Sequence, residues 1–224
     1  MLAHGSRILG LVRAIANPLY RKARFPTSGT DQVYGVNVAR FLADNDQAEQ
    51  LVLSLYGQLA AGMTPGTFVS GEGATIAPLR GQYFRTMYLP PNSAGNAAFL
   101  ETLRLMLVHE TRDATGAPRG LELAFATPRP WLESGKQIDV KSAPTSFGPI
   151  SYTIDAAVGT VSVSLEVPRS AALRSVRLRL RLPAGERMTG ITIDGTPFRR
   201  FDPKTETIDL SGRSGSLWLQ VSHS

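Results

Sequence analysis

The segment TVSVSLEVPRSAALRSVRLRLRL, residues 160–182, decides the fold class of the C-terminal half of this chain. Valine or leucine occupies every second position from Val161 to Val167, and again from Val176 to Leu182. Side chains of a β-strand point alternately to its two faces, so this period predicts strands with one buried and one solvated face. We therefore expect a half-buried antiparallel sheet.

The alternating pattern begins near Gly120 and continues to the end of the chain. Residues 121–125 are its first alternating segment, and a last strand is expected over about 216–222. Asp194-Gly195, between ITI and TPF, predicts a two-residue hairpin turn because both residues adopt positive φ readily. The pattern gives roughly six to eight strands, which is enough for a β-sandwich.

The preceding residues have a helical period instead. Apolar residues recur at spacings of three and four over about 33–43, 48–59 and 93–110, which predicts three helices. We expect Asp44 or Asn45 to cap the second of them, and Asn92 or Ser93 to open the third.

An earlier amphipathic helix is expected within the first 16 residues, with one apolar face formed by Ile8, Leu11, Val12 and Ile15. A secretion signal is the alternative. We prefer the helix because Arg13 interrupts the apolar core that such a signal needs.

The predicted fold class is therefore α+β, with an all-α part over 1–112 and an antiparallel β-sandwich over 118–224. The helical part includes a long loop at 63–92, which has neither a convincing helical nor a convincing strand period. Connections are usually about 4 to 6 residues long, and longer ordered loops commonly carry function.

The loop TFVSGEGATIAPLRGQYFRTMYLPPN, residues 67–92, holds the candidate site. Glu72 stands between two glycines, where a carboxylate could project into a cavity and act as a general acid or base. A solvated loop glutamate is the alternative. Tyr83, Arg85 and Tyr88 offer the aromatic and guanidinium groups that suit a sugar, although the same residues could pack against the helices. Asn92 is interpreted first as a helix cap and second as a ligand contact.

Other candidates have ordinary structural explanations. The alternating Arg177, Arg179 and Arg181 are expected on a solvated sheet face, with polyanion binding as the alternative. His109 is expected near a helix C-terminus, where it complements the helix dipole. Trp131 and Trp218 are expected in the core or at the seam between the two domains, and an exposed Trp218 would instead favour a sugar-binding platform.

Composition narrows the classes of function. The net charge of +6 and the pI near 10.0 come without a lysine-rich run or a nucleic-acid-binding module, so we do not expect a nucleic-acid partner. The chain has no cysteine and three scattered histidines, which disfavours thiol chemistry and a metal site. No apolar run has the length of a membrane span, and the compartment is not predicted.

Four segments carry a family resemblance: TFVSGEGATIAPL, YFRTMYLPPNSAGNAAFLETLRLMLVHE, LELAFATPRPWLESGKQIDVKSAPTSFGPISYTI and IDGTPFRRFDPKTETIDL. From about Val33 onward the chain resembles the C-terminal portion of bacterial six-hairpin glycosidases of the α-L-rhamnosidase-like type. The most distinctive piece is PRPWL, residues 128–132. Such proteins combine an (α/α)6 toroid with a terminal β-sandwich.

The resemblance implies a C-terminal fragment of a glycoside hydrolase that acts on a plant or bacterial polysaccharide or glycoside without a cofactor. Glu72 is the position that matches a late-toroid carboxylate, and its partner acid would lie in sequence outside this chain. The fragment is therefore expected to be inactive alone. The alternative is a noncatalytic carbohydrate-binding or subunit-assembly module, which associates with itself or docks to the missing toroid helices.

Overall fold

The computed structural model describes residues 28–64, 66–79 and 82–224. The chain divides into two compact units, Met1–Leu105 and Met106–Ser224, and each is described by itself. The helix expected within the first 16 residues lies outside the described part. The arrangement of few helices followed by mostly antiparallel sheets is α+β, as predicted.

The first unit is built on helices at the three predicted places. They are α3 (Gln32–Asp44), α4 (Ala48–Gly57) with the π-helix η1 (Gln58–Gly62), and α5 (Ser93–Leu107). Small and apolar residues such as Ala39, Leu51 and Leu55 form the buried faces. Gln58 Nε2 donates to Thr102 Oγ1 at 3.2 Å, which joins η1 to α5.

Two predicted helix ends are wrong. Asn45 does not open α4, because it ends α3: its side-chain Nδ2 donates to the carbonyl of Phe41 at 2.8 Å. The residue that precedes α4 is Gln47. Helix α5 ends at Leu107 and not near Glu110, because the next residues pair with a neighbouring strand.

The expected irregular loop is also wrong, since most of it forms a β-hairpin. Strands β2 (Gly73–Leu79) and β3 (Gln82–Tyr88) pair antiparallel, and β1 (Ser28–Asp31) pairs with β2 in one three-stranded sheet. The strand GATIAPL contains small residues and a proline, so it lacks the usual apolar alternation.

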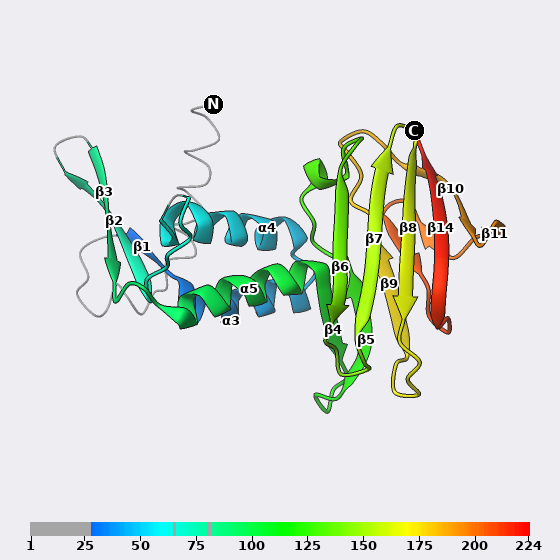
Figure 1. Cartoon of the computed structure of the whole chain (residues 1–224), viewed down its shortest axis with the longest axis horizontal. Coiled ribbons are helices and arrows are strands. Elements are labelled where there is room, and N and C mark those ends of the chain that lie inside the picture. Colours follow the sequence, from blue (N-terminus) through cyan, green and yellow to red (C-terminus); the bar gives the residue numbers. More distant parts are fainter. Residues whose placement is uncertain (1–27, 65, 80–81) are drawn as a thin grey trace. The chain divides into compact units, whose positions relative to one another are not determined.

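The second unit contains two sheets (Figure 1). The six-stranded sheet has the order β11-β10-β14-β8-β7-β6. Its members are β6 (Gln137–Ala143), β7 (Ile150–Ala157), β8 (Thr160–Val167), β10 (Met188–Ile193), β11 (Thr196–Phe198) and β14 (Gly215–His223).

The five-stranded sheet has the order β12-β13-β9-β5-β4. Its members are β4 (Val108–Arg112), β5 (Pro118–Leu123), β9 (Ser175–Arg179), β12 (Phe201–Asp202) and β13 (Thr207–Asp209). The pairing of β5 with β9 is parallel, so the sheets are mostly but not entirely antiparallel. The strands outnumber the predicted six to eight because β11, β12 and β13 have only two or three residues, too few to show a period.

One hydrophobic core receives side chains from both sheets of this unit. The predicted alternation is confirmed, because Val161, Val163, Leu178 and Leu180 are all fully buried. The predicted hairpin is confirmed as well: Asp194 and Gly195 link β10 to β11 with φ of 49° and 78°. In the described part of the chain, no helix has the length and hydropathy needed to cross a membrane.

Candidate functional site

Glu72 lies at a corner where the chain enters strand β2. Its backbone N–H donates to the carbonyl of Tyr88 at 2.9 Å, and the next residue, Gly73, pairs with Tyr88 across the hairpin. The Glu72 residue is half-buried, whereas Tyr88 is 63% exposed. The fold therefore brings the backbones of these two predicted site residues together.

The N-terminus of α5 supports this corner. Asn92 Oδ1 accepts a hydrogen bond from Gly95 N at 2.9 Å, which confirms Asn92 as the helix cap. The backbone N–H of Asn92 donates to the carbonyl of Ser70 at 2.8 Å, and Ser70 Oγ donates to the carbonyl of Asn92 at 2.9 Å. A ligand contact from Asn92 stays a prediction.

Glycines allow the close approach of these segments. A Cβ atom on Gly71 would lie 2.7 Å from the carbonyl oxygen of Tyr88, and one on Gly95 would lie 2.5 Å from that of Gly71. Real Cβ atoms do not approach backbone this closely. The glycines near Glu72 therefore serve packing at the corner, and not only the loop flexibility that the sequence suggested.

The other two predicted sugar contacts lie farther along the hairpin. The register places Arg85 opposite Ile76 and Tyr83 opposite Pro78. At about 3.3 Å per residue, these partners lie roughly 10 and 16 Å along β2 from Gly73. The backbone thus places Tyr88 beside Glu72 and places Arg85 and Tyr83 at increasing distance from it, so their part in one sugar site stays a prediction.

The corner offers one carboxyl group, that of Glu72, and one exposed phenol ring, that of Tyr88, and the backbones of these two residues are hydrogen-bonded. A carboxyl group can transfer a proton, and an aromatic face suits the apolar side of a sugar ring. Glycosidic hydrolysis by the usual mechanisms needs a second carboxyl group. Among the described residues, no group of three or more histidine, aspartate or glutamate side chains could hold a metal ion.

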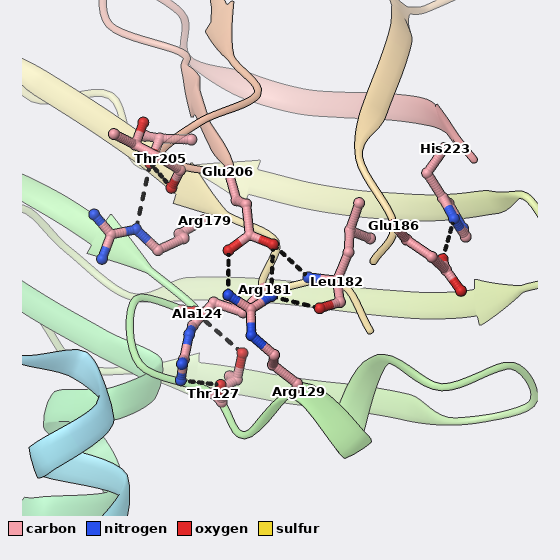
Figure 2. A network of polar contacts seen from close by, with 11 residues as sticks. Ala124, Thr127, Arg129, Arg179, Arg181, Leu182, Glu186, Thr205, Glu206 and His223 are labelled. Carbon is pink, nitrogen blue, oxygen red and sulfur yellow. Dashed lines mark hydrogen bonds and ion pairs between the residues drawn. The ribbon is translucent and has the colours of Figure 1, made fainter. Parts of the chain in front are cut away.

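The arginine row of the second unit differs from the prediction. Arg177 is exposed and lies 3.6 Å from Glu122, as on a solvated face. Arg179 is half-buried, with its guanidinium 4.8 Å from the centre of the Phe125 ring. Arg181 is only 4% exposed, and its Nη1 donates to the carbonyl of Thr127 at 2.8 Å (Figure 2). The expectation of three solvated arginines is therefore wrong for Arg181.

Figure 2 also shows the ion pair that sequence reasoning missed. Arg129 donates to both carboxylate oxygens of Glu206, at 2.7 and 2.9 Å, and to the carbonyl of Leu182 at 2.5 Å. The backbone N–H of Leu182 donates to Glu206 Oε1 at 3.1 Å. Arg129 belongs to the PRPWL segment, so this distinctive piece has a structural role in joining distant parts of the unit.

The predicted place of Trp131 is confirmed, and those of His109 and Trp218 are wrong. His109 lies in strand β4 and not at a helix end; it is buried, and its Nδ1 lies 3.1 Å from Glu122 Oε2. Trp131 packs against the core, as predicted. Trp218 is 50% exposed, so its predicted burial is wrong.

Comparisons with known proteins add little beyond a distant likeness. No family model matches the chain, and no curated protein does. Among solved structures, the chain is similar to one titled "Glycoside hydrolase", with 17% sequence identity and a TM-score of 0.40. The match covers 80% of this chain and 29% of that chain. The chain thus spans less than a third of that protein's length, and a likeness of this size carries no argument about the reaction.

Proposed function

We propose that this chain is the C-terminal part of a carbohydrate-active protein of the glycoside hydrolase class, in which Glu72 supplies one carboxyl group to the sugar site. The observation that carries the proposal is the corner itself. A half-buried carboxylate residue is held between close-packed glycines, and an exposed tyrosine is hydrogen-bonded to its backbone. The sequence resemblance to six-hairpin glycosidases supports it.

In this proposal, Glu72 acts as the general acid or base and Tyr88 stacks on the sugar ring. Tyr83, Arg85 and Asn92 are proposed to extend the site toward neighbouring sugar units. The separation along β2 suits an extended ligand better than a single sugar, because a strand of this length spans several sugar rings. Further helices would complete an (α/α)6 toroid and supply the second carboxylate, and the two C-terminal sheets would form the terminal β-sandwich.

A second candidate is a noncatalytic module that docks to other helices or to a second copy. Exposed apolar side chains favour it, because most of those among the described residues lie in the first unit. They are Tyr34, Phe41, Tyr56, Phe68, Tyr88, Leu89 and Leu100. Docking would remove these side chains from water, which is favourable for apolar surface. In both candidates these side chains contact further helices. Only the first candidate predicts turnover once the missing helices are present.

The experiment compares this chain alone with the complete protein encoded by its gene, using a panel of aryl glycosides. We expect release of the aryl group by the complete protein and no release above background by the 224-residue chain. Size-exclusion chromatography of the chain accompanies the assay. If the complete protein is inactive on the panel while the chain self-associates or binds the missing helices, the assembly role replaces the catalytic one.

A further inference from the structure

Trp218 is the large aromatic side chain that the six-stranded sheet presents to solvent. It lies on β14, between Leu217 and Leu219, which are 7% and 0% exposed. Because neighbouring residues of a strand face opposite sides, burial of these leucines fixes Trp218 on the outer face. Two hydrogen bonds to Asp194 hold its backbone: Asp194 N donates to the Trp218 carbonyl at 2.8 Å, and Trp218 N donates to Asp194 Oδ1 at 3.0 Å.

Residues with hydrogen-bonding side chains follow Trp218 in register on the three strands to one side of β14. Trp218 pairs with Ser164 of β8, which pairs with Thr153 of β7, which in turn pairs with Asp139 of β6. The strands β6, β7, β8 and β14 lie side by side in Figure 1. Along β14 itself, the outward residues on either side of the ring are also polar: Ser216, Gln220 and Ser222. The outer face thus carries one aromatic ring, the Trp218 indole, together with hydroxyl, amide and carboxylate side chains.

The charge of this face limits what could bind there. Carboxylates project from Asp139, Asp155 and Glu166, and Lys141 lies 2.9 Å from the first of them. This excess of acidic groups contrasts with the net charge of +6 of the whole chain. Carboxylates accept hydrogen bonds from hydroxyl groups and repel polyanions. The face therefore favours a neutral, hydroxyl-rich ligand over nucleic acid or an acidic polysaccharide.

We propose that the outer face of the six-stranded sheet is a second carbohydrate-binding surface, with Trp218 as its stacking platform for a neutral polysaccharide chain. A sugar ring would lie on the indole, and its hydroxyl groups would donate to or accept from side chains of β7 and β8. The ring is presented on a strand, so the site needs no loop rearrangement. This surface shares no residue with the Glu72 corner, and it does not depend on the function proposed for that corner.

The experiment is affinity electrophoresis of the full chain through native gels that contain arabinoxylan, galactomannan or xyloglucan, with polygalacturonate as the anionic comparison. We expect retardation in at least one neutral gel. Trp218→Ala should lower the association constant at least ~10-fold, because truncation of a central aromatic contact removes most of the binding energy of a small interface. Val158→Ala is the matched control, since that side chain is exposed and apolar but lies at the turn between β7 and β8.

Circular dichroism of each variant checks that the fold is retained, as expected for an outward side chain. Unchanged mobility of the native chain in all three neutral gels would overturn the proposal, as would equal retardation of Trp218→Ala. A concentration-dependent dimer that Trp218→Ala abolishes would identify a second copy of the chain as the occupant instead. Loss of retardation in Trp218→Ala reports on the sheet face, and turnover of aryl glycosides by the complete protein reports on the Glu72 corner, so failure of one proposal is distinguishable from failure of the other.

Discussion

Replacing Glu206 with alanine is expected to lower the free energy of unfolding of the second unit by about 2–3 kcal/mol. The Glu206 carboxylate accepts three hydrogen bonds, two from the Arg129 guanidinium and one from the backbone N–H of Leu182. Its side chain is only 14% exposed, whereas that of Arg129 is 37% exposed. Removing one partner of a fully buried pair costs about 3–5 kcal/mol, and the partial exposure of Arg129 reduces this loss.

Urea denaturation followed by tryptophan fluorescence measures this effect, because both tryptophans lie in the second unit. Glu133→Ala is the matched control, since Glu133 is an exposed glutamate of the same unit and should change stability by less than about 0.5 kcal/mol. Glu206 has a φ of 56°, and alanine adopts that conformation no more easily than glutamate, so the comparison isolates the side chain. Equal midpoints for Glu206→Ala and Glu133→Ala would show that the ion pair contributes nothing.

Replacing Gly95 with alanine is expected to destabilise the helical unit by about 2–3 kcal/mol, although alanine is normally the better helix former. The new Cβ would lie 2.5 Å from the carbonyl oxygen of Gly71 and 2.6 Å from Ser70 Oγ. The backbone contact cannot be relieved by a rotamer change, so the first turn of α5 must move away from the corner that holds Glu72.

Gly35→Ala in α3 is the matched control for this change. A Cβ on Gly35 meets nothing within 4 Å, so the same substitution there should stabilise the protein by about 0.5–1 kcal/mol. The helical circular dichroism signal during urea denaturation reports both variants. Opposite signs at the two positions are the expected result. Stabilisation by both substitutions would mean that α5 does not pack closely on the glycine corner.

The parts of the fold that could be predicted from sequence are those in which apolar residues recur regularly because one face of the element is buried. Strands β8 and β9 bury every second side chain in a shared core, so their alternation was visible. Strands β2 and β3 belong, with β1, to a small separate sheet, and β2 consists largely of small residues, so it shows no such alternation. The Val108–Arg112 strand follows α5 directly, with no glycine or proline between them, and only its pairing with β5 shows where the helix ends.

Only those features of the candidate site that are formed by residues close in sequence could be predicted. A carboxylate between two glycines and a capping Asn92 are features of neighbouring residues, and the structure places them at one corner. The exposure of a side chain depends on tertiary packing, which local sequence does not give. Arg181 is therefore buried and Trp218 exposed, against the predictions. The exposure of Trp218 favours the alternative assignment, a sugar platform, which stays a prediction.

The measurement that most directly tests the carbohydrate assignment is the kcat/KM of Glu72→Gln relative to the native complete protein on the aryl glycoside that is hydrolysed fastest. Glutamine keeps the size of the side chain but cannot donate or accept the catalytic proton. Loss of at least ~100-fold is predicted, which is the low end for removal of a general acid or base. Glu133→Gln should leave the rate unchanged. A rate for Glu72→Gln within a factor of about two of the native rate would contradict a catalytic role for Glu72, because uncompensated loss of a proton-transfer group cannot be that small.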